Sequence, residues 1–257
     1  MQRPWEEDFD FYLSRMGKDP VAVLVDLGAG PHLPDPDLNV RVRVLLHLRE
    51  PGADGLVTAE ERPRLYEATD RLAAAVGEGL GGVLVGRVMV QGLADLVFYA
   101  PGTAVGQIDE LRRMVDGVRE EYDVDLDVAP DISWQFYREV LWPDAYEHQF
   151  ILNNRVLRQL EQAGDDPTCA RPVDHLVFLP DRERARTAAE QLRALGFDIP
   201  EPEAEEDGSF RIAFQGETAL DDGAIHEHVA SILGVVLPLE GSYDGWGCAV
   251  IGGDRPA

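Results

Sequence analysis

The spacing of apolar residues along the first half of the chain predicts a series of short strands and two helices. Helical spacing predicts one helix that begins at Thr58 and ends at Gly77, and another over Ala104–Tyr122. Alternating and β-branched stretches predict strands at Asp8–Ser14, Ala22–Asp26, Val40–Leu48, Val83–Val90, Leu93–Tyr99 and Val124–Val128. From Val40 onward the predicted order of elements is therefore βαββαβ.

The first of these helices carries signals at both ends. Thr58 is an N-cap residue, and Glu61, three residues later, completes a capping box. Gly77 is a natural helix end, and with it begins Gly77-Glu78-Gly79-Leu80-Gly81-Gly82, which satisfies G-x-G-x-x-G. A dinucleotide-binding fingerprint follows a strand and opens a helix, whereas this segment ends a helix and opens a strand. We therefore predict a helix cap and a turn here.

The second half repeats the same order of elements. A lead-in helix is expected at Asn153–Ala163, and an acidic loop at Glu201–Asp207. Helices are expected at Asp181–Leu195, which ends at Gly196, and at Asp221–Leu233, with Asp221 as its cap. Strands are expected at Asp174–Leu179, Phe210–Phe214 and Tyr243–Ile251, with a weak strand at Phe197–Ile199.

These patterns predict an α+β protein of two ferredoxin-like (βαββαβ) sandwich domains. Right-handed crossovers would place both helices of each domain on one face of an antiparallel sheet and leave the other face open. An aromatic segment that includes Trp134-Gln135-Phe136-Tyr137 and Leu141-Trp142-Pro143 closes the first half. We expect domains at residues 1–145 and 151–253.

The charge of the chain restricts its partners. Lys and Arg number 23 against 48 Asp and Glu, a net charge of −25 that is shared by both halves, and a hydrophobic content of 45% supports a folded core. The electrostatic field of such a chain repels phosphates, which argues against direct nucleic-acid binding, because affinity for phosphates comes chiefly from Lys and Arg. The field favours a basic protein surface as partner, although high acidity also serves solubility alone.

No arrangement of residues indicates an active site, a metal or a cofactor. His226-Glu227-His228 places two imidazoles on different faces of a helix, so we expect one histidine exposed and one packed against the sheet. Cys169 and Cys248 lack a zinc-type spacing and form no disulfide framework. His175 has no evident catalytic partner. The chain shows no secretory signal and no apolar run long enough for a membrane, so a cytoplasmic location is expected.

The segment Tyr243-Asp244-Gly245-Trp246-Gly247 is the strongest candidate for partner binding. A tryptophan between two glycines fits a core position in the last strand, with the glycines making room for the ring. It also fits a surface aromatic beside a bare backbone, which suits recognition of a partner. Under the second interpretation Tyr243, Asp244, Gly245, Trp246 and Gly247 form a contact face with Asp165, Asp166 and Asp174 nearby. Asp165, Asp166 and the 201–207 loop either serve solubility and capping or contribute to an acidic docking face.

This segment resembles the signature of the bacterial inhibitors called regulator of ribonuclease E activity B. Gly164-Asp165-Asp166-Pro167 and Val173-Asp174-His175 extend the resemblance over residues 151–253. It implies a non-catalytic regulatory protein that inhibits an RNA-degrading endonuclease by occupying a protein surface. The resemblance also implies a long acidic tail after the signature strand, where this sequence has only Gly252 to Ala257.

The first half is similar to a bacterial family of unknown function, number 695. The resemblance rests on Trp5, Phe11-Tyr12, Val25-Asp26-Leu27-Gly28, Asp54-Gly55, Val85-Gly86-Arg87 and Trp134-Gln135-Phe136-Tyr137. It implies no biochemical function. Two alternatives to the regulatory role stay open: an enzyme or small-ligand binder that uses the cleft between the domains, and a neutralising partner of a basic toxin-like protein.

Overall fold

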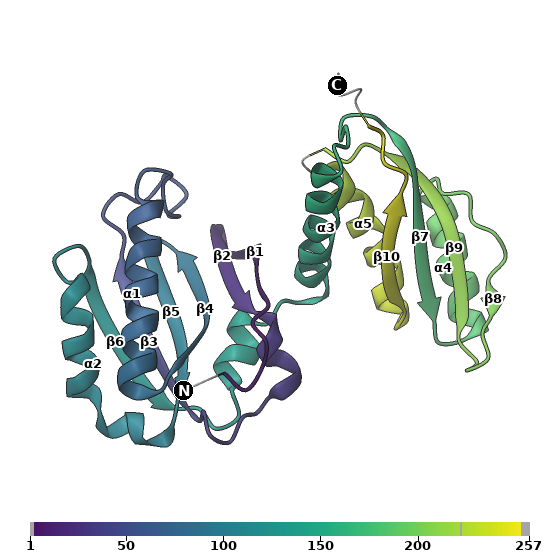
Figure 1. Cartoon of the computed structure of the whole chain (residues 1–257). Helices are drawn as coiled ribbons and strands as arrows, with labels where there is room; N and C mark the ends of the chain where they lie inside the picture. Colours follow the sequence, from purple (N-terminus) through teal and green to yellow (C-terminus); the bar gives the residue numbers. More distant parts are fainter. Residues whose placement is uncertain (1–2, 222, 253–257) are drawn as a thin grey trace. The chain divides into compact units, whose positions relative to one another are not determined.

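The computed structural model describes residues 3–221 and 223–252 and divides the chain into two compact units, Met1–Glu147 and His148–Ala257. Each unit contains one antiparallel β-sheet with helices packed on it (Figure 1). The chain is therefore a mixed α and β protein with two sheets. Asp222, within the helix expected at 221–233, lies outside the described residues, as do residues 253–257 after the signature strand.

The first unit is built on a six-stranded sheet in the order β1-β2-β4-β5-β3-β6. Its strands are β1 (Phe9–Met16), β2 (Asp19–Asp26), β3 (Val40–His47), β4 (Val83–Val90), β5 (Leu93–Ala100) and β6 (Asp123–Pro130). Its helices are α1 (Arg62–Leu80) and α2 (Ile108–Val115), with short turns η1 (Leu27–His32), η2 (Gly102–Gly106), η3 (Asp116–Val118) and η4 (Tyr137–Leu141).

The core of this unit lies between the sheet and the two helices. Alternate residues of β3, from Val40 to Leu46, point to the same side and are almost fully buried. They pack with Leu65 and Leu72 of α1 and with Leu111 of α2. Burial of this apolar stripe, more than helix propensity, holds α1 and α2 on the sheet.

The face expected to be open is partly covered in the first unit, which corrects the prediction. Trp134 is fully buried and its ring stacks on that of Tyr99 with centroids 3.7 Å apart. The hydroxyl of Tyr137, at the start of η4, donates to the backbone oxygen of Asp26 at 2.7 Å. Aromatic residues at 134–142 therefore fold back across the sheet instead of only ending the unit.

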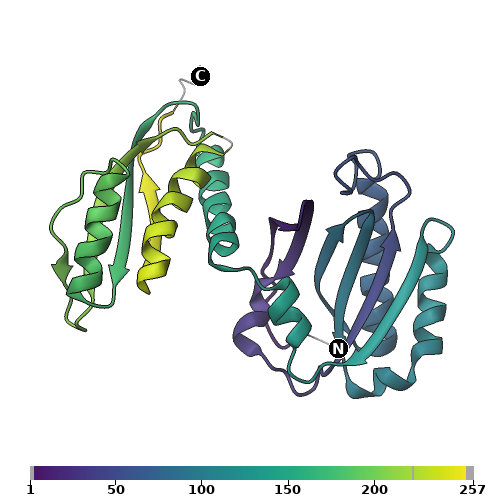
Figure 2. The same cartoon turned by 180° about the vertical axis from the view of Figure 1, so that it is seen from behind.

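The second unit contains a four-stranded sheet in the order β10-β7-β9-β8. Its strands are β7 (Arg171–Leu179), β8 (Glu203–Ala204), β9 (Phe210–Thr218) and β10 (Ser242–Cys248). Its helices are α4 (Arg182–Ala194) and α5 (Ala224–Val236), followed by η5 (Leu237–Leu239) and preceded by α3 (Ala145–Gln162), which begins in the first unit. Both α4 and α5 lie on one face of this sheet (Figure 2).

The predicted βαββαβ order of elements is present in both units, but several boundaries were wrong. The helix begins at Arg62 and not Thr58. The hydroxyl of Thr58 accepts from the backbone N–H of Glu61 at 3.3 Å, which is one half of the predicted capping box, but the carboxylate of Glu61 accepts from the backbone of Arg49 and Glu50 and leaves the other half unmade. The helix continues past Gly77 to Leu80, where Gly81 takes the left-handed conformation with φ 67°. The glycine-rich segment is a helix end and a turn, as predicted.

Three further segments differ from the prediction. The helix expected at Ala104–Tyr122 is confined to α2, because glycines interrupt the pattern on both sides. The weak strand expected at Phe197–Ile199 is an isolated bridge from Asp198 to Gln215, and β8 lies instead within the acidic loop. Gly223 occupies the position before α5, so Asp221 is not its cap.

Candidate functional site

The signature strand β10 lies at an edge of the four-stranded sheet and pairs with β7. The register shifts between Tyr243 and Gly245, so Asp244 is an extra residue that bulges out of the ladder. Gly245 adopts φ 113°, a conformation that a side chain would strain. Because the bulge adds one residue, Tyr243 and Trp246 point to the same side of the sheet.

That side is the one covered by helices. Trp246 lies opposite His175 of β7, is partly buried, and packs with the apolar cluster that α5 and the two leucines of α3, Leu157 and Leu160, supply. Its indole Nε1 donates to Oδ1 of Asn153 at 2.8 Å. Asn153 of α3 is itself buried, so this hydrogen bond and the packing of the Trp246 ring hold α3 against β10.

Tyr243 ends a chain of polar groups in which His175 is buried and Tyr243 and His228 are partly buried. Its hydroxyl lies 2.8 Å from Nδ1 of His175, whose Nε2 lies 3.0 Å from Nε2 of His228. Burial and, to a smaller extent, the neighbouring His228 lower the pKa of His175 from its ordinary value of 6.5 to about 4. Burial also lowers the pKa of His228. These imidazoles are therefore neutral groups that link β7, α5 and β10.

The two aspartates before β7 are held in the loop by local interactions. Oδ1 of Asp165, whose side chain is 2% exposed, accepts from Nη1 of Arg171 at 2.5 Å and from the backbone N–H of Ile251 at 2.7 Å. Asp166 caps the following turn and accepts from the hydroxyl of Thr168 at 2.7 Å, which lowers the pKa of Asp166. Asp165 therefore holds the backbone at Ile251, after β10, beside the start of β7.

Asp174 lies on the opposite, uncovered face of the sheet. Val173 and Val177 of β7 are buried under the helices, so Asp174, Leu176 and Phe178 point away from them. Gly245 and Gly247 lie opposite Leu176 and Asp174, and neither would meet another atom within 4 Å if it carried a Cβ. The two glycines of the signature thus expose bare backbone on the open face, while the tryptophan between them faces the helices.

The structure therefore divides the predicted site residues into three places. The open face contains Asp174, Gly245 and Gly247, with exposed Asp244 at the bulge. The covered face contains Tyr243 and Trp246, and the loop before β7 contains Asp165 and Asp166.

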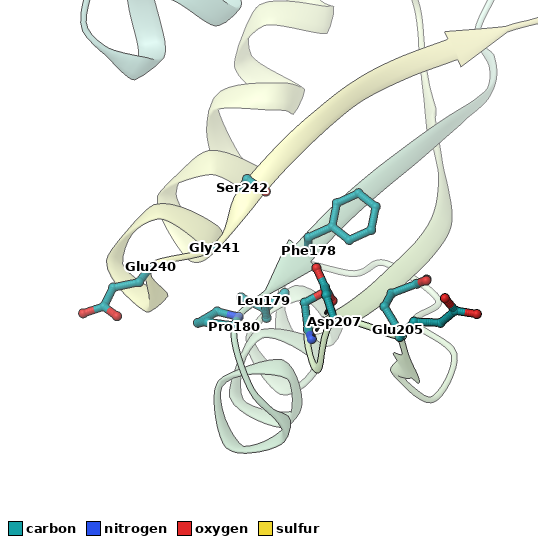
Figure 3. Close-up of a pocket in the computed structure, with 10 residues that line it drawn as sticks. Phe178, Leu179, Pro180, Glu205, Asp207, Glu240, Gly241 and Ser242 are labelled. Atoms are coloured by element: carbon teal, nitrogen blue, oxygen red, sulfur yellow. Dashed lines mark hydrogen bonds between the residues drawn. The ribbon is translucent and has the colours of Figure 1, made fainter.

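An acidic pocket of about 710 Å³ lies at one end of this sheet (Figure 3). Phe178 lies between the acidic loop, which contributes Glu205, Glu206 and Asp207, and Glu240 after η5. No residue among those that line it is basic. Phe178 is partly exposed there, so an aromatic ring lies among carboxylates on one surface.

Some of these carboxylates are already paired. The carboxylate of Glu205 forms an ion pair with Arg211, with Oε1 3.1 Å from Nε, and Glu240 accepts from Nη2 of Arg184 at 3.0 Å. Asp207 accepts from the hydroxyl of Ser209 at 2.6 Å, and this bond lowers the pKa of Asp207. Among the described residues, four carboxylates and no basic residue line the pocket, so it is electronegative, which suits a cationic side chain.

Sequence reasoning identified the acidic loop but not the pocket that it helps to build. Phe178 and Glu240 lie 62 residues apart and line the same pocket because β7 and β10 are neighbours. The signal available in the sequence was the alternation along β7, which sets Asp174, Leu176 and Phe178 apart from the buried valines.

The described residues offer little to other kinds of site. Among residues 3–221 and 223–252, no group of three or more histidine, cysteine, aspartate or glutamate side chains is placed to hold a metal ion. Over the same residues, every helix falls short of the length and apolarity that crossing a membrane requires. Cys169 and Cys248 are both free thiols.

The second unit is similar to known regulators. The family described as "Regulator of ribonuclease activity B" matches residues 151–248. The protein of that name from Escherichia coli (strain K12) is 28% identical over 109 residues, which cover 41% of this chain and 79% of the relative. The one from Proteus mirabilis (strain HI4320) is 26% identical over 96 residues, 36% of this chain and 67% of the relative.

The comparison with solved structures is less informative. A crystal structure of an unknown protein from Galdieria sulphuraria covers 82% of this chain and 99% of that chain, at 10% identity and a TM-score of 0.23, which supports no argument. The first unit has a clear assignment, because a family model matches residues 7–142, more than half of the chain. The chain therefore belongs to the family of unknown function DUF695, and its second unit matches the family of regulators of ribonuclease activity B.

Proposed function

We propose that this chain is a non-catalytic regulator that binds an RNA-degrading endonuclease through the open face of its second sheet. The observation that carries the proposal is that the region similar to regulators of ribonuclease activity has one uncovered face, which ends in an acidic pocket around Phe178. A regulator that works by occupying a surface needs such a face and needs no catalytic group.

The chemistry of the face selects a basic partner. Carboxylates at 205–207 and 240 attract Lys and Arg, and the ring of Phe178 offers a cation–π contact worth about 0.5–1 kcal/mol at an exposed site. A net charge of −25 speeds the approach of a cationic surface and repels RNA. In this proposal the open face occupies the RNA-binding residues of the partner. The regulator acts in the cytoplasm and contacts neither nucleic acid nor membrane.

The scaffold in this proposal is ferredoxin-like in both units, at residues 1–145 and 151–253. The strand orders β4-β5-β3-β6 and β10-β7-β9-β8 support it, because in each the first and third strands of the βαββαβ motif lie between the second and fourth. The predicted contact residues Asp174, Gly245, Gly247 and Asp244 remain part of the proposed face. Tyr243 and Trp246 would support it from behind, and Asp165 and Asp166 would hold the adjoining loop.

The test is inhibition of purified ribonuclease E acting on a fluorogenic RNA, with the full chain added in increasing amounts. We expect the cleavage rate to fall to a plateau at a fixed molar ratio, and the effect to weaken as salt rises. The variant Glu206→Gln/Glu240→Gln should weaken inhibition about tenfold at low salt, because it removes two charges from the pocket.

The matched control is Glu67→Gln/Glu78→Gln, which makes the same change of charge on exposed positions of α1. It should inhibit as the unmodified chain does. Equal loss in both double variants would mean that only overall charge matters, and absence of inhibition by the unmodified chain would end the proposal.

A further inference from the structure

The hairpin of β1 and β2 extends the six-stranded sheet beyond the edge of α1. Phe11 lies opposite Leu24 of β2, and Leu24 lies opposite Arg87 of β4, so the three form one row across the sheet. Arg87 is on the helix side, since its guanidinium carbon lies 4.8 Å from the ring centroid of Tyr66 in α1. The helix layer thus ends at Tyr66, and Phe11 remains 47% exposed.

A pocket of about 400 Å³ lies between α1 and the β1–β2 hairpin, where the helix layer ends. Its walls are mostly apolar and include Phe11, Leu13, Leu24, Tyr66 and Met89. The volume lies within the range of small-molecule sites, which are largely apolar with a few placed polar groups.

The polar groups in this pocket are cationic. Arg87 lines it and is 6% exposed, and Nε of Arg87 has no hydrogen-bond partner among the described residues. Exposed Arg62 is a second lining residue, and none of the residues that line the pocket is acidic. In a chain of 48 acidic and 23 basic residues, a pocket lined by two arginines and no carboxylate is opposite in sign to the net charge of the chain.

The buried guanidinium of Arg87 has an N–H group, at Nε, without an acceptor in the described part of the chain. Burial lowers the pKa of Arg87, and interactions with Tyr66 and Asp70 from α1 only partly oppose this. An arginine side chain stays charged even so, and a buried charge without a full set of partners is costly. A carboxylate bound in the pocket against the guanidinium of Arg87 would offset that cost.

We propose that this pocket binds a small amphiphilic carboxylate, a molecule with one carboxylate and an apolar chain or ring. The carboxylate pairs with Arg87, with Arg62 nearby, and the apolar part lies over Phe11, Leu24 and Met89. The site belongs to the first unit and is independent of the regulatory role proposed for the second.

The test compares octanoate with 1-octanol by isothermal titration calorimetry on the full chain. The two probes share an apolar tail and differ in the charged group, so the structure predicts that octanoate binds about tenfold or more tightly than octanol, the effect of one charged hydrogen bond. Arg87→Met should abolish this preference and leave octanol binding unchanged. Arg112→Gln, on the exposed side of α2, removes the same charge elsewhere and should keep it.

A second variant keeps the test decisive if Arg87→Met does not fold. Ala22 lines the floor of the pocket between Leu13 and Met89, and Ala22→Phe should fill it and weaken both probes. Equal affinity for octanoate and octanol in the unmodified chain, or octanoate binding that survives Ala22→Phe, would overturn the proposal. If a peptide with a free C-terminal carboxylate binds more tightly than octanoate, the ligand is a protein segment and not a small molecule, and the proposal is overturned as well.

Discussion

Replacing Trp246 by alanine tests the two roles that the signature strand allows. The ring is partly buried against α3 and α5, and its Nε1 donates to Asn153 at 2.8 Å. Removal of a buried aromatic ring costs about 3–5 kcal/mol, and the partial exposure of Trp246 places it at the lower end, about 3 kcal/mol. Trp246→Phe keeps most of the packing and loses one hydrogen bond, about 1 kcal/mol. Asn153 still accepts from Gln149 in that variant, so it is not left without a partner.

Urea unfolding followed by circular dichroism measures these free energies on the full chain, and calorimetry measures the melting temperature of each unit. For a unit of this size, a loss of about 3 kcal/mol lowers the melting temperature by roughly 10 °C or more. Hydrogen exchange should rise in the peptides of α3 and β10, because Trp246 joins these elements. Asp244→Ala, at the exposed bulge beside it, is the control and should leave stability within about 0.5 kcal/mol.

The opposite result would refute the reasoning. If Trp246→Ala melts within about 1 °C of the unmodified chain and yet loses inhibition of the ribonuclease, the ring is a surface anchor of the type that dominates interfaces. A large loss of stability in Trp246→Ala with normal inhibition at low temperature confirms a supporting role behind the open face.

Two further predictions concern buried ionisable groups of the second unit. The pKa of His175 is about 4 in the folded chain and 6.5 in the unfolded chain, so between these values only the unfolded chain takes up the proton. The contribution of His175 to the free energy of unfolding is therefore complete above pH 6.5 and is lost as pH falls toward 4. The total loss is about 3 kcal/mol. His175→Asn should flatten the fall of urea-unfolding free energy over that range, and an unchanged slope would contradict the assignment. Arg171→Met leaves the carboxylate of Asp165 buried without its cation and should cost about 3–5 kcal/mol, while Arg171→Met/Asp165→Leu should recover most of it in a double-mutant cycle.

The order of elements could be predicted because it depends on local periodicity. Alternation along β3 and helical spacing along α1 both survive in the structure, and each reflects one face of an element packed against a core. The ends of elements were less predictable. The spacing of Glu61 after Thr58 predicts that its carboxylate takes part in a capping box. In the structure the carboxylate accepts from the backbone N–H groups of Arg49 and Glu50, in a loop that is close to Glu61 only in the folded chain.

The candidate sites depended still more on contacts between distant residues. Nothing near Arg87 in the sequence indicates a ligand pocket, which appears only where the β1–β2 hairpin extends past Tyr66. Likewise Phe178 acquires acidic neighbours from residues 205–207 and 240, which the sheet order brings together.

The sequence by itself determined the two βαββαβ runs, the negative charge of both halves and the resemblance of each half to a family, because all three are properties of short segments or sums. Only the tertiary structure decided which way the signature strand faces. Strict alternation would put Tyr243 and Trp246 on opposite sides, but the bulge at Asp244, which exists only in the pairing of β10 with β7, puts both under the helices and leaves Gly245 and Gly247 on the open face.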